Sequence, residues 1–102
     1  MERTIRPQDV NPDIAFVLDV RREADHATSA ETLPGAIWKN PEKIDAWIAA
    51  VPRTQDVVIY CVRGGAVSNS VVDRLRAAGV KARYIEGGIE AYKAAGGRVV
   101  AK

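Results

Sequence analysis

The only cysteine of the chain, Cys61, stands between an apolar run and a pair of glycines, which makes it the first candidate for chemistry. Residues 57–61 are β-branched, aromatic or small and apolar, a pattern typical of a strand buried on both faces of a parallel sheet. From Val67 onward apolar residues recur at helical spacing, and Gly79 follows where that helix would end. Cys61 is therefore predicted at the carboxyl end of a central strand, one loop before a helix.

The loop that follows Cys61 has the composition of an anion-binding cradle. Gly64 and Gly65 allow the backbone to turn so that successive N–H groups point inward, and a helix N-terminus adds about half a positive charge. Such surroundings bind an anion and favour a thiolate over a thiol. Arg63 would strengthen both effects with its guanidinium turned toward the loop.

A lone cysteine on an apolar strand more often packs in a core than reacts. The position of Cys61 favours chemistry, however, because open α/β sheets bind their ligands at the carboxyl ends of the strands. The loop after Cys61 is therefore the candidate site.

Length and composition limit what else the chain can be. A chain of 102 residues buries on the order of 65% of its unfolded surface, so we expect one domain over residues 1–102. Its 15 Lys and Arg residues are scattered among 13 Asp and Glu residues, which leaves a net charge of +2 and no patch for nucleic acid. No membrane span is expected, because no run approaches about eighteen apolar residues.

The start of the chain and its single cysteine indicate a compartment. One cysteine excludes an internal disulfide, and the first residues lack the apolar core of a signal peptide. We therefore expect a cytoplasmic protein.

The hydrophobic pattern alternates strands with helices. The connections are short and call for crossover units, which require a mostly parallel sheet covered on both faces. We therefore expect an α/β fold. Strands are predicted at residues 4–6, 14–20, 36–38, 57–61 and 82–85, helices at 41–51, 67–78 and 89–95, a helical turn at 7–10, and a terminal strand or extended tail at 98–100.

Three ring side chains receive structural interpretations. His26 lies in a polar segment, residues 22–31, that we expect to be a short helical turn and a loop, and it is interpreted as a solvated loop histidine rather than a base. Trp38 and Trp47 are interpreted as core residues, Trp47 on the apolar stripe of a helix capped by Asn40.

Four motifs together resemble the rhodanese-like family of single-domain sulfurtransferases over nearly the whole chain. They are Leu18–Arg21 at a strand end, Leu33–Ala36 before a strand, the Tyr60–Cys61 loop with its helix, and Glu86–Tyr92. Each motif alone is weak, but their order and spacing are specific. The resemblance implies a parallel sheet of about five strands flanked by helices.

By this resemblance Cys61 is the nucleophile of a sulfur transfer. Its thiolate attacks the sulfane sulfur of a donor such as thiosulfate, sulfite leaves, and the persulfide passes its sulfur to a thiol, a protein or cyanide. The resemblance implies no metal or organic cofactor, a small anionic donor, a thiol or protein acceptor, and a monomer or weak homodimer. Substrate binding is assigned to the loop, by its N–H groups and side chains, at Val62, Arg63, Gly64, Gly65, Ala66, Val67 and Ser68.

Other residues match family positions whose role is structural. Asp19 and Arg21 are interpreted as a polar pair that holds the strand end and the neighbouring loop. Glu86 is interpreted as ordering the loop near the site, and Gly87 and Gly88 as shaping the backbone.

The loop departs from the family pattern. Many members carry an arginine five residues after the nucleophile, where this chain has Ala66, and Ser68 lies seven residues after Cys61 rather than six. The loop thus looks like the longer type found in cell-cycle phosphatases and arsenate reductases of the superfamily. Those enzymes keep an arginine where this chain has Val67, and a phosphoryl transition state would lack its bidentate clamp here.

Several functions remain open on these residues. The loop resembles that of a variant of bacterial sulfurtransferases, some associated with chromate resistance, in which Arg63 would supply the charge, and an active sulfurtransferase is the leading hypothesis. The alternative, suggested by Ala66 and Val67, is a catalytically weak rhodanese-like binding or sulfur-relay module. An arsenate reductase or phosphatase is the minor alternative.

Overall fold

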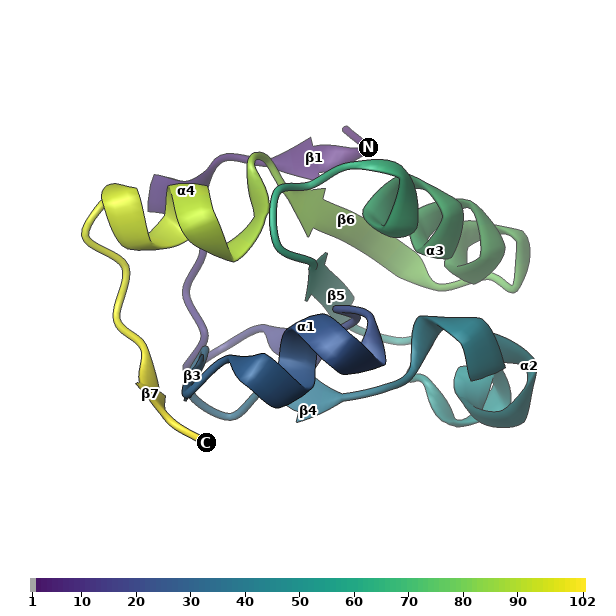
Figure 1. Cartoon of the computed structure of the whole chain (residues 1–102). Coiled ribbons are helices and arrows are strands. Elements are labelled where there is room, and N and C mark those ends of the chain that lie inside the picture. The colour runs from purple at the N-terminus through teal and green to yellow at the C-terminus, as the bar shows by residue number, and fades with distance from the viewer. Residues whose placement is uncertain (1) are drawn as a thin grey trace.

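Five parallel strands form the sheet that positions Cys61 in the computed structural model, which describes residues 2–102 (Figure 1). Their order across the sheet is β1-β6-β5-β2-β4, and every neighbouring pair is parallel. The strands are β1 (Thr4–Ile5), β2 (Phe16–Asp19), β4 (Ile37–Trp38), β5 (Asp56–Tyr60) and β6 (Lys81–Ile85). The predicted α/β fold with a parallel five-stranded sheet is confirmed.

The register of the central strands brings their carboxyl ends together. Asp19 at the end of β2 lies opposite Tyr60 at the end of β5, and on its other side it lies opposite Trp38 of β4. Beyond the strands the pairing continues, because the Val20 N–H donates to the Tyr60 carbonyl at 2.9 Å. The carboxyl ends of β2, β4 and β5 therefore lie side by side next to Cys61.

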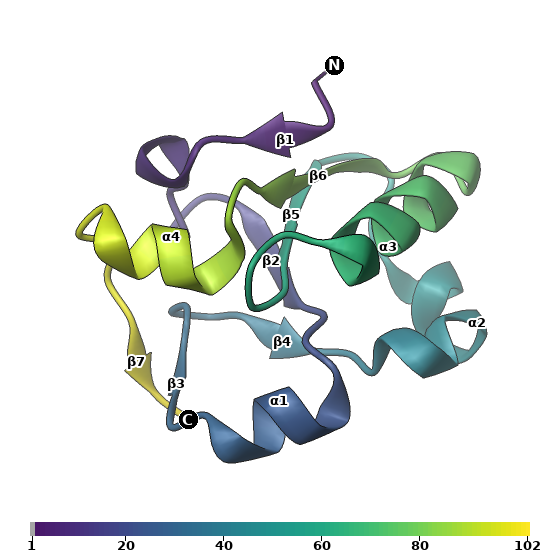
Figure 2. The ribbon, with the colours of Figure 1, turned by 45° about the horizontal axis from the view of Figure 1, so that its top comes forward.

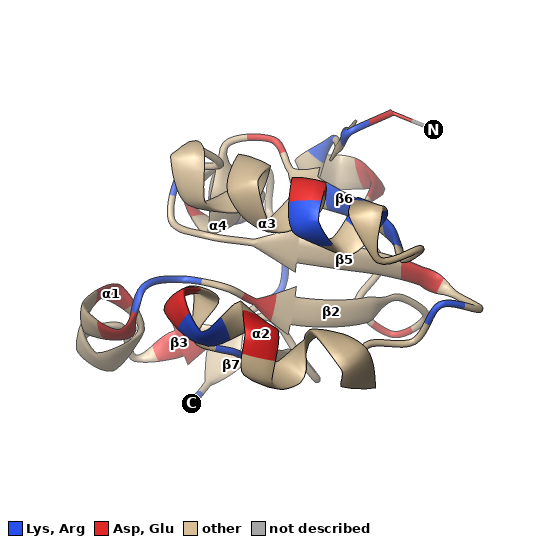
Figure 3. Ribbon diagram, turned by 90° about the vertical axis from the view of Figure 1, so that its right-hand side faces the viewer, with Lys and Arg blue, Asp and Glu red and all other residues tan. Residues whose placement is uncertain are grey.

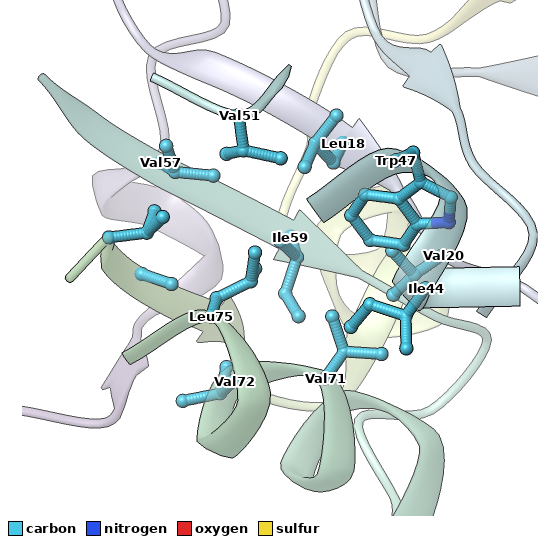
Figure 4. Packing of buried hydrophobic residues seen from close by; sticks show 12 residues of the cluster. Leu18, Val20, Ile44, Trp47, Val51, Val57, Ile59, Val71, Val72 and Leu75 are labelled. Carbon is cyan, nitrogen blue, oxygen red and sulfur yellow. The ribbon is translucent and has the colours of Figure 1, made fainter. Parts of the chain in front are cut away.

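Both faces of the sheet are covered, as the apolar run of β5 predicts. Val57 and Ile59 face one hydrophobic cluster, and Val58 and Tyr60 face the other. The first cluster, shown in Figure 4, consists of Leu18, Val20, Ile44, Trp47, Val51, Val57, Ile59, Val71, Val72, Leu75, Val80 and Ala82. The second consists of Ile5, Val17, Leu33, Val58, Tyr60, Ile85, Ile89 and Tyr92. Each fully buried aliphatic side chain stabilises the fold by about 1.5–3 kcal/mol.

Within residues 2–102, four α-helices and three short 3₁₀ helices surround the sheet. The α-helices are α1 (Glu23–Thr28), α2 (Ile44–Trp47), α3 (Ala66–Ala77) and α4 (Gly88–Ala94), and the 3₁₀ helices are η1 (Pro7–Asp9), η2 (Pro41–Lys43) and η3 (Ile48–Ala50). The predicted helix after the cysteine is confirmed as α3. It ends as expected, because Gly79 has φ +86° and its N–H donates to the Arg76 carbonyl at 3.0 Å.

The prediction of one continuous helix over residues 41–51 is wrong. Asn40 does cap the segment, since its side chain accepts from the Glu42 N–H at 3.0 Å. The segment then divides into η2, α2 and η3, because Lys43 and Trp47 adopt φ of −116° and −123°, wider than an α-helix allows. Trp47 turns its ring into the core there, and its indole N–H donates to the Asn40 carbonyl at 2.8 Å.

Two further predictions need correction at short elements. Residues 31–32 were expected in a loop but form β3 (Glu31–Thr32), which pairs antiparallel with β7 (Val100–Ala101), so the C-terminal segment is a strand. The strand predicted from residue 14 begins only at Phe16. Ile14 is exposed because a turn at Asn11 extends this far, with the N–H groups of Ile14 and Ala15 donating to the Asn11 carbonyl.

Among residues 2–102 no helix is long and apolar enough to cross a membrane. Basic and acidic residues are interspersed over the elements rather than gathered on one of them (Figure 3).

Truncating a buried residue of α3 tests the packing of the first cluster. Leu75 is fully buried, so we expect Leu75→Ala to lower the free energy of unfolding by about 2–5 kcal/mol through lost contacts and a cavity. Ala77→Ser at an exposed position of the same helix should change it by less than about 0.5 kcal/mol. Urea unfolding measures both, and equal effects would contradict the packing described here.

Candidate active site

Cys61 follows the last residue of β5, and two donors converge on its sulfur. The Gly64 N–H donates to Sγ at 3.2 Å and the Ser68 hydroxyl at 3.0 Å. Ser68 is fully buried in the first turn of α3, while Cys61 is 7% exposed. Two hydrogen-bond donors therefore contact the sulfur of a slightly exposed cysteine, an arrangement that stabilises negative charge on sulfur.

Only one of the two glycines in the loop is required by its conformation. Gly64 has φ +68°, and a Cβ there would lie 2.9 Å from the Gly87 nitrogen and 3.0 Å from the Ile85 carbonyl oxygen. Gly65 has a negative φ and open space where a Cβ would stand. Gly64 alone therefore supplies the turn that was expected of the pair.

The start of α4 holds the cysteine loop from the other side (Figure 2). The Ile89 N–H donates to the Cys61 carbonyl at 3.0 Å, and the Glu90 N–H donates to the Val62 carbonyl at 3.2 Å. Gly88, with φ +64°, permits this approach, because a Cβ on it would lie 2.4 Å from the Val62 oxygen. Sequence reasoning foresaw the shape of this turn but not its contact with the cysteine loop, since only the long-range fold joins them.

Asp19 and Arg21 form a buried ion pair beside the site, with side chains 1% and 2% exposed. Arg21 donates to the Asp19 carboxylate from Nε at 3.0 and 3.1 Å and from Nη2 at 2.7 Å. Its Nη2 also donates to the Glu31 carbonyl at 3.0 Å. Burial alone would lower the pKa of Arg21, but the hydrogen bond and charge of Asp19 outweigh burial and raise it. The pair thus joins the end of β2 to β3.

Tyr60 extends this network, although the sequence singled it out only as part of a motif. Its hydroxyl shares a 2.8 Å hydrogen bond with the Thr32 hydroxyl and accepts from the Leu33 N–H at 3.3 Å. The Arg21 guanidinium carbon lies 5.5 Å from the ring centroid. Burial, reinforced by the charge of Asp19, raises the pKa of Tyr60 to about 12. A tyrosine in an apolar strand signals such a network, because its hydroxyl needs a partner once buried.

The surroundings of His26 and Trp38 differ from those predicted. His26 lies in α1, not in a loop, and its ring stacks on Trp38 with centroids 4.7 Å apart and an angle of 16°. Its Nε2 lies 3.9 Å from the Asp19 carboxylate, and burial lowers its pKa. Trp38 is half-buried rather than in the core, because β4 is an edge strand, and its indole N–H donates to the Arg21 carbonyl at 2.9 Å.

A cavity of about 280 Å³ opens at Cys61. It is lined by Arg22, Asp25, Cys61, Val62, Arg63, Gly65, Ala66 and Val67. Five of the seven predicted substrate-binding residues therefore line it, and the other two, Gly64 and Ser68, are the donors to the sulfur. Sequence reasoning missed Arg22 and Asp25, because nothing in the pattern of α1 indicates that it forms a wall of this cavity.

The side chain of Glu86 lies away from the cysteine loop. Glu86 is exposed and lines a different cavity with Thr4, Ile5 and Arg83, and within residues 2–102 its side chain makes no hydrogen bond or ion pair. The structure therefore does not bring the Glu86 side chain to the cysteine loop. In the same range no three His, Cys, Asp or Glu side chains lie close enough to hold a metal ion.

The Asp19–Arg21 pair should be a principal determinant of stability. Asp19→Ala leaves the Arg21 guanidinium buried without its counter-charge, so we expect the free energy of unfolding to fall by about 3–5 kcal/mol. Asp13→Ala, which removes the exposed ion pair with Arg98, should cost at most about 1 kcal/mol. Urea unfolding at neutral pH measures both variants, and a loss no larger for Asp19→Ala than for Asp13→Ala would show that burial gives this pair no special weight.

Comparison with solved structures supports the fold. The chain superposes on a rhodanese-related protein from Thermoplasma volcanium with a TM-score of 0.86 and 23% identity, covering 99% of this chain and 100% of that one. It superposes on the rhodanese-like domain of an Anabaena protein with a TM-score of 0.76 and 22% identity, covering 100% of this chain and 81% of that one.

Sequence comparison gives the family. The chain is 36% identical over 52 residues to the tRNA 2-selenouridine synthase of Shewanella woodyi, and 33% identical over 72 residues to that of Shewanella frigidimarina. These matches cover 51% and 71% of this chain but only 14% and 19% of the two synthases, so the chain spans less than a fifth of either. Residues 5–95 match the family model of the rhodanese-like domain. The chain therefore belongs to this family within the sulfurtransferase superfamily.

Proposed function

We propose that this chain transfers sulfane sulfur through a persulfide on Cys61, with thiosulfate or a related anion as donor and a thiol or protein as acceptor. The observation that carries the proposal is the convergence of the Gly64 N–H and the Ser68 hydroxyl on Sγ, at the mouth of a cavity that two arginines line. Donors at sulfur suit a reaction in which sulfur carries negative charge before and after each step.

The reaction consists of two displacements at sulfur. The Cys61 thiolate attacks the outer sulfur of thiosulfate, a new S–S bond forms, and the bond to the sulfonate sulfur breaks as sulfite leaves with the electron pair. An acceptor thiolate then attacks the outer sulfur of the persulfide, and the Cys61 thiolate leaves. The Gly64 and Ser68 donors stabilise the Cys61 sulfur whenever it carries the charge, and Arg22 and Arg63 offset the charge of the donor.

The lining of the cavity also supports one alternative. Ala66 and Val67 stand where related loops carry an arginine, and Arg63 is exposed and without a hydrogen bond within residues 2–102. A domain without a fixed cation in its loop suits a relay or binding module that turns over small donors slowly. The absent arginine argues more strongly against a phosphatase or arsenate reductase, and the likeness to part of the selenouridine synthases favours sulfur or selenium chemistry.

Thiosulfate treatment tests the proposal directly. We expect the intact wild-type chain to gain the mass of one sulfur atom and to form thiocyanate when cyanide is added, because the persulfide is the intermediate of both steps. Cys61→Ser should show neither signal. A mass gain without thiocyanate would favour the relay module, and the absence of both from the folded wild type would refute sulfur transfer.

The Ser68 hydroxyl should assist persulfide formation. Ser68→Ala removes one of two donors to the sulfur, so we expect the rate of persulfide formation with thiosulfate to fall about tenfold or more, as for the loss of a hydrogen bond to a charged group. Thr54→Ala removes an exposed hydroxyl elsewhere and should leave the rate unchanged. Rapid-quench mass spectrometry measures the rate, and equal rates for the two variants would refute the role of Ser68.

A further inference from the structure

Helix α1 forms one wall of the cavity at Cys61, although few of its side chains pack against the rest of the molecule. Arg22, directly before the helix, and Asp25 within it line the cavity. Within Glu23–Thr28 every residue is exposed except His26. A helix of six residues is not stable by itself in water. The attachment of α1 to the sheet therefore depends mainly on His26.

The ring of His26 packs on Trp38, whose own position is fixed. The two rings are stacked with centroids 4.7 Å apart, and the Trp38 indole N–H donates to the Arg21 carbonyl at 2.9 Å. Figures 1 and 2 both show α1 at the margin of the molecule, beside β4. The His26 Nε2 lies 3.9 Å from the Asp19 carboxylate, too far for a hydrogen bond. Stacked rings rather than a polar bond thus hold α1 in place.

The segments on either side of α1 are anchored without His26. Before the helix, Arg21 is bonded to the Asp19 carboxylate at 2.7 Å. After it, the Ser29 hydroxyl donates to the Glu31 carbonyl at 3.2 Å, and β3 pairs with β7. Helix α1 can therefore detach by a local opening while the sheet stays folded.

The surroundings of His26 disfavour a positive charge on its ring. From the end of β2, the Asp19 carboxylate attracts such a charge and Arg21 repels it. Lys102, which follows β7, also repels it, and its Nζ donates to the His26 carbonyl. Trp38 of β4 is uncharged, and the charged residues within one turn on α1 itself are exposed: Arg22, Glu23 and Asp25. Burial outweighs the attraction of Asp19 and lowers the pKa of His26.

We propose that His26 is a positioning residue for the Cys61 cavity: its neutral ring holds α1 against Trp38, and its protonation releases this wall and widens access to the thiol. The attached helix favours the neutral ring, so protons drive detachment. Attachment is at full strength above the ordinary pKa of histidine, about 6.5, and weakens as the pH falls through the lower pKa of His26. The cavity thus widens in acid, independently of the group that Cys61 transfers.

Nuclear magnetic resonance tests the attachment of α1 directly. We expect the ring protons of His26 to titrate with a pKa below that of an exposed histidine. Linkage sets the size of the effect, because a pKa lower by one raises the opening of α1 about tenfold once His26 is protonated. Hydrogen exchange of the His26 amide, which donates to the Arg22 carbonyl, measures this opening after correction for the intrinsic rate. A pKa at or above the ordinary value, as a cation held over the indole face would give, would overturn the proposal.

Three variants separate the ring from its charge. His26→Phe keeps an aromatic ring on Trp38 but cannot titrate, so the corrected exchange in α1 should be slow and independent of pH. His26→Ala removes the stack and should give fast exchange at every pH. Ala27→Ser, at an exposed position of the same helix, should behave as the wild type. An acid response that persists in His26→Phe would assign the opening to another group and refute the role of His26.

Two neutral reagents of different size report on access to Cys61. N-methylmaleimide and N-phenylmaleimide both react with the thiolate, so the ratio of their rates cancels the titration of the thiol itself. We expect the phenyl-to-methyl ratio of the wild type to rise severalfold as His26 becomes protonated. The ratio should stay low in His26→Phe and high in His26→Ala at every pH. Mass spectrometry of the intact chain measures both rates.

The outcomes are distinct from those of the sulfur-transfer test. A constant ratio in the wild type, with exchange in α1 that follows the His26 titration, would show that the helix moves without widening the cavity, which contradicts the proposal. The maleimides need no sulfur donor. A chain that forms no persulfide can therefore still show the acid response, and a chain that forms one can lack it.

Discussion

The arrangement around the cysteine depends on the buried ion pair of Asp19 and Arg21. The pair is nearly inaccessible to water, so each charge requires the other, and the guanidinium requires the Glu31 carbonyl as well. These bonds join two segments at the carboxyl end of the sheet, namely the end of β2 and strand β3. Tyr60 of β5 packs against the same guanidinium, and the next residue is Cys61. Cys61 is therefore positioned by an electrostatic contact in which it takes no part.

The cysteine loop itself is fixed by backbone contacts from α4. Two N–H groups at the start of α4 hold the carbonyls of Cys61 and Val62, and glycine at position 88 lets the two backbones approach. The donors to sulfur then come from within the loop and from α3. Two helices that are distant in sequence thus contact the cysteine loop. Helix α4 holds its backbone, and α3 contributes a hydroxyl that donates to the sulfur.

Sequence reasoning succeeded where a pattern is local and repeated. The apolar run of β5, the helical spacing of α3 and the glycine after it were sufficient to place Cys61 at the end of a central strand. It failed where long-range contacts decide. Strand β3 exists because β7 pairs with it, and the segment at 41–51 breaks where Trp47 enters the core. The stacking of His26 on Trp38 depends on the position of α1, as does the entry of Arg22 into the cavity, and neither leaves a periodic signal.

The residues around Cys61 fall into a buried group and an exposed group, which differ in how easily they can change. Ser68 is fully buried, and a Cβ on Gly64 would lie about 3 Å from the neighbouring backbone, so changes at either position disturb the fold around the cysteine. Arg22 and Arg63 are exposed, and within residues 2–102 nothing in the fold relies on their guanidinium groups. These two positions can therefore change at little cost to the fold, so the lining of the cavity can vary in evolution while the loop that holds Cys61 stays the same.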